Sequence, residues 1–207
     1  ALGSDNSPPK TRTVTCMNVN YIIAWRQFTL DFWAAMHRAA DGTFTFSPGM
    51  NPEGPDWNNL FHYLNSHPNA VDFDVSNWDG YLRADLFYHC IDLIIELIDP
   101  NNEELRNVLY SIAFEVMNSF IQFDNIIYQK HRGMVSGFPG TAEMNTLAHW
   151  LLICYIYLLL TQGTKYNNLA SMFHHIAVAI YGDDIIITFS DEIRPYFNGT
   201  KIMAGYQ

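Results

Sequence analysis

The chain has 207 residues, of which 49% are hydrophobic and 15% charged, and its formal net charge is −10. This composition is too apolar for a disordered chain, and the length suits one domain or two small lobes that share a core. The acidic balance argues against a protein that coats nucleic acid through a basic face. It does not exclude an enzyme that binds phosphates through metal ions held by its own carboxylates.

The cysteines and the longest apolar run bear on the redox compartment of the protein and on whether it crosses a membrane. Cys16, Cys90 and Cys154 are far apart and lack metal-binding spacing, so we predict free thiols in a reducing compartment. The run at 150–160 is well short of the ~20 apolar residues that cross a bilayer, which predicts a buried helix. We predict no signal peptide and no transmembrane segment, and we expect the chain to be a piece of a longer protein.

The first part of the chain contains strand, helix and loop patterns. Residues 10–16 alternate polar and apolar side chains and predict a short strand, whereas 21–39 carry apolar residues at helical spacing. Residues 41–58 are punctuated by glycine and proline and predict a loop. The pattern at 70–75 predicts a short buried strand that ends in polar residues.

Helices dominate the middle of the chain. Apolar spacing predicts a helix over 82–97, stopped by a proline, and a second helix over about 102–119. Residues 121–129 predict a strand. A Gly-rich loop at 133–141 leads into a long apolar helix over about 142–160.

Two β-branched runs, 176–180 and 185–189, are separated by Tyr-Gly-Asp-Asp. They predict a hairpin with a four-residue connection. Because strands and long helices are mixed along the chain, we expect an α+β fold, or a ferredoxin-like sheet backed by helices.

Acidic side chains lie where two predicted strands end. Asp183 and Asp184 are adjacent at the hairpin tip, Asp74 ends an earlier strand, and Asp79 follows five residues later. Carboxylates from two strand ends can share a pair of divalent ions for phosphoryl or nucleotidyl transfer, because Mg²⁺ prefers carboxylate oxygens. The alternative interpretation is structural, with a Gly-Asp turn, a strand end and a helix cap.

Two further segments carry groups that suit a phosphate or a sugar. Ser136, Thr141 and Asn145 place short hydrogen-bonding side chains beside a helix N-terminus. Lys10 and Arg12 alternate on a strand, so both cations share one face and could grip a triphosphate. The structural alternatives are a helix cap for Ser136 or Thr141, and a solvated strand edge for the two cations.

In this order the segments resemble the viral RNA-dependent RNA polymerases of the picornavirus-like order. The family's motifs F, A, B and C match Lys10/Arg12, "DVSNWD" at 74–79, "SGFPGTAEMN" at 136–145 and "YGDD" at 181–184. The internal spacings agree, and the resemblance covers essentially the whole chain. It implies a right-hand polymerase palm, a small antiparallel sheet backed by helices, with part of the fingers.

The resemblance also implies a division of the chain. Residues 1–70 correspond to partial fingers and the fingers–palm connection, with motif F at the start. Residues 71–207 correspond to the palm core with motifs A, B and C and an incomplete motif D, and they include a fingers-type insertion at about 100–132. Lys201, in an expected helix, lies too early to be the family's general-acid lysine. We therefore expect this chain alone to make little or no RNA processively.

The implied activity is template-directed RNA synthesis, in which a nucleotide is transferred from a nucleoside triphosphate to an RNA 3′-hydroxyl. Asp74, Asp183 and Asp184 are the implied catalytic residues and ligands of two Mg²⁺ or Mn²⁺ ions. The residues implied to bind the triphosphate and the ribose are Lys10, Arg12, Asp79, Ser136, Thr141 and Asn145. A carboxylate with an amide can recognise the 2′-hydroxyl, which both donates and accepts a hydrogen bond.

The implied partners are RNA template and primer, nucleoside triphosphates, other viral replication proteins, and the fingers and thumb segments absent from this chain. The implied location is the host cytoplasm, at membrane-associated replication complexes. Other activities stay open on the residues alone. They are a metal-dependent phosphodiesterase or nuclease that uses the same carboxylates, a reverse transcriptase-like polymerase, and an acidic module that binds a basic partner through residues 41–124.

Overall fold

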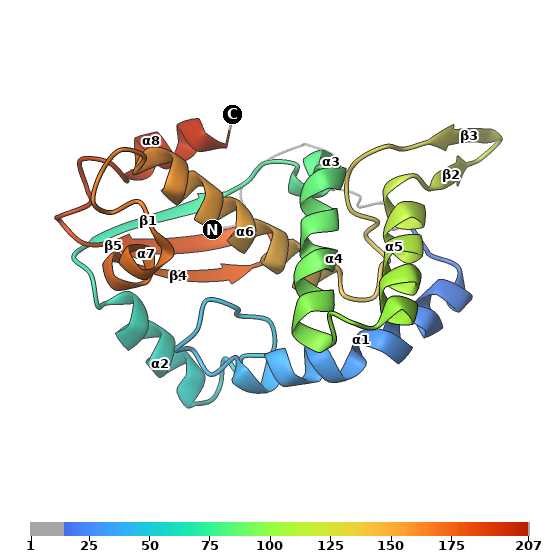
Figure 1. Cartoon of the computed structure of the whole chain (residues 1–207), viewed down its shortest axis with the longest axis horizontal. Coiled ribbons are helices and arrows are strands. Elements are labelled where there is room, and N and C mark those ends of the chain that lie inside the picture. The colour runs from blue at the N-terminus through green and yellow to red at the C-terminus, as the bar shows by residue number, and fades with distance from the viewer. Residues whose placement is uncertain (1–14, 207) are drawn as a thin grey trace, which may run out of the picture.

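A computed structural model describes residues 15–206 of the chain. A small sheet with flanking helices adjoins a helical region, and α6 (Thr141–Leu160) runs through both (Figure 1). The strand predicted at 10–16 falls almost wholly outside the described residues. Cys16, at its end, forms an isolated parallel bridge with Gly137.

Three antiparallel strands form the main sheet. They are β1 (Asn69–Asp74), β4 (Ile176–Tyr181) and β5 (Asp184–Phe189), in the order β1-β5-β4. β5 is therefore the central strand, and it joins the hairpin to a strand from much earlier in the chain. The predicted hairpin and the strand predicted at 70–75 are confirmed, except for the length of the hairpin connection.

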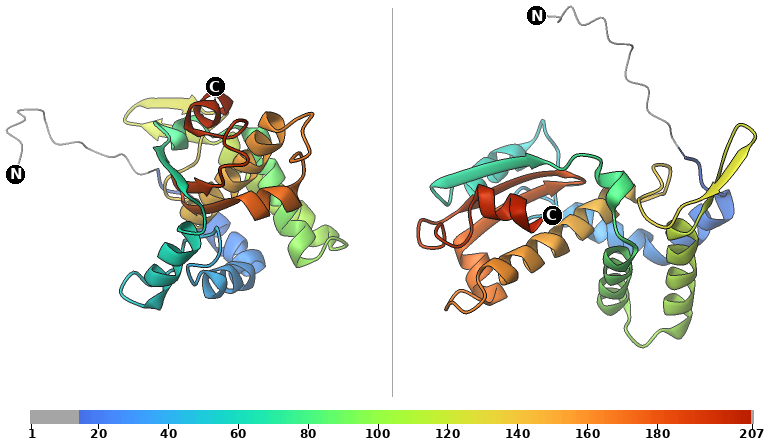
Figure 2. Two further views of the ribbon diagram at one scale, coloured as in Figure 1. Left: turned by 90° about the vertical axis from the view of Figure 1, so that its left-hand side faces the viewer. Right: turned by 90° about the horizontal axis from the view of Figure 1, so that it is seen from above.

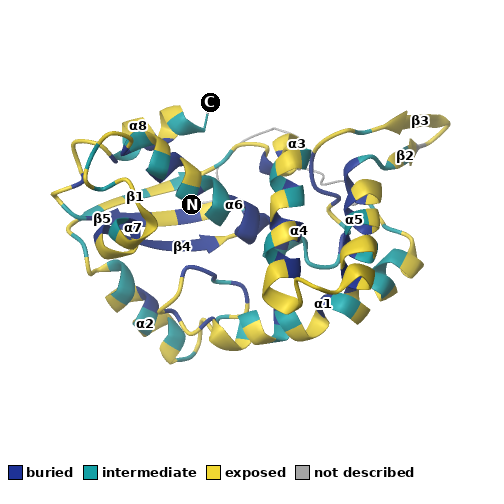
Figure 3. Cartoon of the chain, viewed as in Figure 1, coloured by how far each residue is buried: buried dark blue, intermediate teal, exposed yellow. Residues whose placement is uncertain are grey.

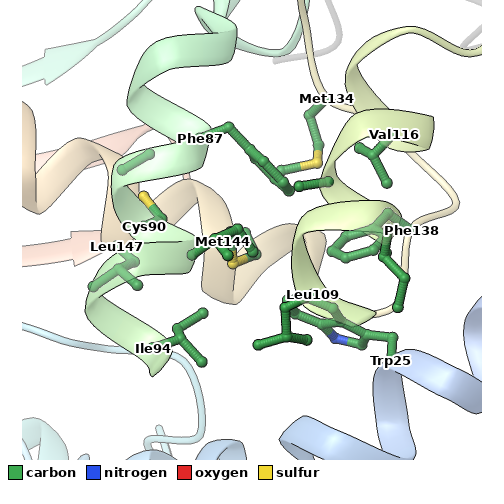
Figure 4. Packing of buried hydrophobic residues seen from close by; sticks show 14 of the residues in the cluster. Trp25, Phe87, Cys90, Ile94, Leu109, Val116, Met134, Phe138, Met144 and Leu147 are labelled. Carbon is green, nitrogen blue, oxygen red and sulfur yellow. The ribbon is translucent and has the colours of Figure 1, made fainter. Parts of the chain in front are cut away.

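Three long helices form most of the helical region: α1 (Val19–Ala39), α4 (Ala84–Ile98) and α5 (Glu103–Met117). They agree within a few residues with the predicted helices, because each has an apolar face that is buried and a polar face that is exposed (Figure 3). Trp25 and Phe87 are fully buried and meet side chains of α5 and α6 in the core of this region (Figure 4).

Three short helices lie where the sequence predicts none: α2 (Pro55–Leu64), α3 (Trp78–Tyr81) and α7 (Leu169–His175). The prediction of a loop over 41–58 is thus wrong from Pro55 onward, where α2 begins. The fixed backbone angle of a proline suits the first turn of a helix, so Pro55 starts α2 instead of extending the loop. The last helix, α8 (Gly199–Gly205), contains Lys201 as expected.

α6 is shared by the two hydrophobic cores. Met144 and Leu147 belong to the core of the helical region, and Ile153 and Ile156 belong to the core that packs on the sheet. Within the described residues it is the one helix long and apolar enough to match a membrane span. Half of that apolar window is buried inside the protein, however, where α6 packs against α4, β4, α7 and α8. The run at 150–160 is thus helical as predicted, with Ile153, Ile156 and Tyr157 buried but Tyr155 and Leu159 exposed.

A second, two-stranded sheet projects from the helical region (Figures 1 and 2). It consists of β2 (Phe120–Phe123) and β3 (Ile126–Gln129), so the single strand predicted at 121–129 is wrong in its middle. Asp124 adopts a positive φ of 53°, which reverses the chain there. Aspartate and asparagine tolerate this conformation better than most residues, and the pair Asp124-Asn125 is therefore a turn signal.

The outer edge of β4 is covered by earlier parts of the chain. The backbone N–H of Val178 donates to the hydroxyl of Tyr63 in α2 at 3.2 Å. The N–H of Ile180 donates to the carbonyl of Thr45 at 2.9 Å, and its carbonyl accepts from the N–H of Ser47 at 3.0 Å. This edge therefore has paired backbone groups and does not offer a template for another strand.

Thr188 in β5 allows a test of the packing of the sheet. Its side chain is buried, and its hydroxyl has no hydrogen-bond partner among residues 15–206. An unpaired buried polar group costs about 1–3 kcal/mol, so we expect Thr188→Val to raise the free energy of unfolding by about 1 kcal/mol. Urea denaturation measures the change. Thr161→Val is the control, and it should lose stability because the Thr161 hydroxyl donates a hydrogen bond to the backbone carbonyl of Tyr157 at 2.8 Å.

Candidate active site

The main sheet has a covered face and an open face. Val71 and Phe73 of β1 and Ile185 and Ile187 of β5 point into the core that contains α6. α6 and α8 lie together on that side of the sheet (Figure 2). Because side chains alternate along a strand, the neighbouring residues of β1 and β5 project to the other face, and Asp74 is among those that are exposed.

The register of the sheet brings two of the predicted carboxylates together. Asp74, the last residue of β1, is paired directly with Asp184, the first residue of β5. Residues that face each other in antiparallel strands have Cβ atoms ~4.5–5.5 Å apart and project on the same side. Asp74 and Asp184 are therefore neighbours on the open face, although they are far apart in sequence.

The hairpin connection is shorter than the sequence predicts. Tyr181 pairs with Asp184, so the turn consists of two residues, Gly182 and Asp183, and the predicted four-residue connection is wrong. Gly182 has a positive φ of 64°, a conformation that glycine adopts without steric cost. The tight turn holds Asp183 directly beside the Asp74–Asp184 pair.

The chemistry of these donors suits a hard divalent cation. Asp74 and Asp184 are exposed and Asp183 is half-buried, so their oxygens can be reached from solvent. Mg²⁺ and Mn²⁺ bind carboxylate oxygens and leave positions for substrate phosphates. In the described part of the chain, no three or more His, Cys, Asp or Glu side chains lie close enough together to hold a metal. The backbone thus makes the three carboxylates neighbours, but their side chains do not form a closed set of ligands.

A cavity of about 360 Å³ lies beside the carboxylates. Its walls come from the open face of the sheet, through Tyr181, Asp184 and Ile186, from the segment before α2, through Met50, and from α2 itself, through Trp57. This cavity offers an apolar surface directly next to the acidic side chains. Such a combination suits a ligand with an apolar face, and it suits phosphate groups only through a bridging cation, because carboxylates repel phosphates.

Asp79 and Asn145 meet across the site. Asp79 lies in α3, which follows β1, and Asn145 lies in the first part of α6. The amide nitrogen Nδ2 of Asn145 donates to Oδ1 of Asp79 at 2.8 Å. The other amide atom, Oδ1 of Asn145, is buried and has no hydrogen-bond partner among residues 15–206. The pair therefore leaves one acceptor unpaired, and that acceptor is buried inside the protein.

The hydroxyls of Ser136 and Thr141 both form hydrogen bonds with backbone groups. Ser136 bonds to Thr15, and Thr141 bonds to the loop that precedes α6. The Ser136 hydroxyl accepts a hydrogen bond from the N–H of Thr15 at 2.9 Å. The Thr141 hydroxyl donates to the carbonyls of Val135 at 3.1 Å and Phe138 at 2.7 Å. Neither is the N-cap of α6, which is a glycine without a side-chain cap. These hydroxyls hold the loop in shape.

Lys130 is a basic residue near the site that is not among the residues predicted from the sequence. Lys130 is half-buried, and its Nζ donates to the carbonyl of Gly133 at 2.6 Å. Burial lowers the pKa of Lys130 to about 8, and the Asp79 carboxylate acts in the opposite direction. No sequence pattern distinguishes this lysine, because its burial depends on how the loop folds. The predicted cations Lys10 and Arg12 lie outside the described residues.

The fold is that of a right-hand polymerase palm. The Sicinivirus 3Dpol RNA dependent RNA polymerase has the same fold over 91% of this chain and 37% of its own, with a TM-score of 0.71 and 18% sequence identity. The family model for viral RNA-dependent RNA polymerase matches residues 6–206. The chain belongs to the viral RNA-dependent RNA polymerase family, as its resemblance to that family implies.

The curated relatives are viral polyproteins. The chain is 28% identical over 201 residues to the genome polyprotein of Deformed wing virus and 28% identical over 200 residues to the RNA1 polyprotein of Red clover mottle virus. It is 27% identical over 207 residues to the replicase polyprotein of Acute bee paralysis virus (strain Rothamsted). These alignments take in 94–96% of the chain but only 7–11% of each polyprotein.

Gly182 provides a test of the turn geometry. Its positive φ costs an alanine about 1–2 kcal/mol, while an added Cβ would meet no atom within 4 Å, so we expect Gly182→Ala to lose about that much stability. Gly163→Ala is the matched control, since Gly163 also has a positive φ and free space around it. Both variants should lose similar stability in urea denaturation. A much larger loss in Gly182→Ala would contradict the free space that the structure shows around an added Cβ at Gly182.

Proposed function

We propose that this chain carries the catalytic carboxylates of an enzyme that copies a viral RNA genome by adding nucleotides to an RNA 3′-hydroxyl. The observation that carries this proposal is the direct pairing of Asp74 with Asp184 beside the turn that contains Asp183. Family membership supports the activity, since the match covers nearly the whole chain. The proposal concerns the complete polymerase, of which this chain supplies the palm core.

Asp74, Asp183 and Asp184 are the proposed holders of two Mg²⁺ or Mn²⁺ ions. When bound, such ions supply Lewis-acid stabilisation of the charge on the primer oxygen and the leaving pyrophosphate. The contribution of the chain is positional. The strand pairing fixes the carboxylates on the open face, and the adjacent cavity gives the nucleotide and primer a place beside them. Little else is required of the protein in phosphoryl-type transfer.

Asp79 and Asn145 are the proposed readers of the ribose. The 2′-hydroxyl can donate to the free Oδ1 of Asn145 and accept from a neighbouring donor, whereas a deoxyribose leaves that buried acceptor unpaired. Asp79 orients the amide through its hydrogen bond. We propose that Ser136 and Thr141 act one step further away, by holding the loop that leads into α6.

The remaining assignments rest on the family resemblance. Lys10 and Arg12 are proposed to contact the incoming triphosphate, since a guanidinium binds phosphate with two parallel hydrogen bonds. Residues 1–70 are proposed as partial fingers and their connection to the palm, and 71–207 as the palm core with a fingers-type insertion at about 100–132. Template, primer, other replication proteins and the rest of the fingers and thumb are the proposed partners. The proposed location is a membrane-associated complex in the host cytoplasm.

The catalytic proposal is tested by neutralising one carboxylate. In the complete polymerase that contains this chain, we expect Asp183→Asn to lower primer extension with Mg²⁺ by a factor of at least ~100, because a group that stabilises transition-state charge is lost. Asp72→Asn is the control, since the same substitution is made at an exposed aspartate of β1 that pairs with Ile186 and not with a carboxylate. It should retain activity. Labelled RNA that is shortened instead of lengthened would identify a nuclease and refute the polymerase assignment.

The ribose proposal is tested by truncating the amide. We expect Asn145→Ala to reduce the preference for ribonucleotides over deoxyribonucleotides by about tenfold, in line with the loss of about one hydrogen bond. The measurement is kcat/KM for each nucleotide. Asn69→Ala is the control, because Asn69 also donates to a carboxylate, that of Asp191 at 2.9 Å, at the far end of β1. An unchanged preference in Asn145→Ala would count against this role.

A further inference from the structure

Both backbone groups of Gly182 are bound by one helix. The N–H of Gly182 donates to the hydroxyl oxygen of Thr146 at 2.8 Å, and its carbonyl lies 3.1 Å from Nδ1 of His149. Thr146 and His149 both belong to α6, on the covered side of the sheet. Since Gly182 directly precedes Asp183, these two bonds fix the backbone from which that carboxylate projects.

The hydrogen-bond partners of His149 determine its tautomer. The carbonyl of Gly182 can only accept, so Nδ1 of His149 carries the proton. Nε2 is then the acceptor, and it receives a hydrogen bond from the hydroxyl of Tyr206 at 2.5 Å. Burial lowers the pKa of His149 to about 4, so the ring is neutral near pH 7. Every polar atom of this buried side chain therefore has a matching partner.

Thr146 and His149 are also fixed by packing. His149 is completely buried, and its ring lies 4.6 Å from that of Trp78, centroid to centroid, in the helix that follows β1. The Thr146 hydroxyl donates to the carbonyl of Ala142 at 2.7 Å, which fixes the orientation of the lone pairs that receive Gly182. Side chains held in this way can impose a position on the turn.

We propose that Thr146 and His149 are positioning residues that hold the Gly182 turn and thereby set the place of Asp183 and Asp184 opposite Asp74. The three carboxylates repel one another, and the two bonds to α6 oppose an outward displacement of the turn. Both residues are buried and bond directly to the turn, and His149 also packs on Trp78, the residue before Asp79. The inference rests on the proposed function, because it concerns the carboxylates that are proposed to hold the metal ions.

The first test uses Thr146 in the complete polymerase. Thr146→Val keeps the shape of the side chain but removes the acceptor, whereas Thr146→Ser keeps the hydroxyl. We expect the Val variant to raise the Mg²⁺ concentration for half-maximal primer extension by ~10–100-fold and to lower kcat, as loss of a residue behind metal ligands does. KM for the nucleotide should change less than about threefold, and the Ser variant should resemble the wild type. Thr188→Val is the control for the same substitution elsewhere in the core.

The second test uses His149. His149→Asn keeps an N–H near the position of Nδ1, whereas His149→Leu fills the space without a donor. We expect the Asn variant to keep the wild-type response to Mg²⁺ even if it is less stable, and the Leu variant to shift it as Thr146→Val does. The control is His175→Leu, since His175 is also buried, with Nδ1 2.9 Å from the Ser190 hydroxyl, at the other end of the hairpin.

The outcomes separate this inference from the proposed function. If wild-type polymerase extends a primer and Asp183→Asn does not, but Thr146→Val and His149→Leu respond to Mg²⁺ as the wild type does, the positioning inference is overturned and the proposed function stands. If the wild type shows no metal-dependent extension, both are overturned. Thermal unfolding identifies any variant that does not fold. Thr146→Ala, which removes the same oxygen and adds no atoms, then takes the place of Thr146→Val and is judged by the same Mg²⁺ response.

Discussion

The antiparallel pairing of β1 with β5 is the constraint on which the site depends. It sets Asp74 opposite Asp184 and determines which face of each strand is open. A slip of one residue would turn every side chain of β1 to the other face, so the same pairing that packs Val71 and Phe73 against the core also exposes Asp74. The core and the candidate active site are thus specified by one register, and neither can shift without the other.

α6 relates this sheet to the rest of the molecule. Its first turns belong to the core of the helical region and its later turns to the core on the sheet. The polar residues that bond to Asp79 and to Gly182 lie in the first half of the helix. Because one rigid helix contacts both the segment after β1 and the hairpin turn, the two candidate sites for sugar and metal recognition share a single frame.

The sequence predicts the elements of this fold better than the contacts between them. Apolar periodicity identifies the long helices and the hairpin. Two local predictions are wrong: Pro55 begins a helix where a loop is predicted, and Asp124 forms a turn where a strand is predicted. Carboxylates at two strand ends and the resemblance to a known family both predict that Asp74 lies near the hairpin tip, but neither predicts the register that pairs it with Asp184. Thr146 and His149 are not among the residues predicted from the sequence. Polar residues inside an apolar helix indicate buried hydrogen-bond partners, and here these partners are the backbone groups of Gly182.

The covered edge of β4 contrasts with the edge that carries Asp74. Tyr63 and residues 45–47 occupy that edge, whereas β1 pairs with β5 alone within the described part of the chain. Among the described residues no further strand pairs with β1, so Asp74 lies on an edge strand of the sheet. The two edges of the sheet therefore differ: the edge at β4 is covered by Tyr63 and residues 45–47, whereas the edge at β1 pairs with no further strand among the described residues.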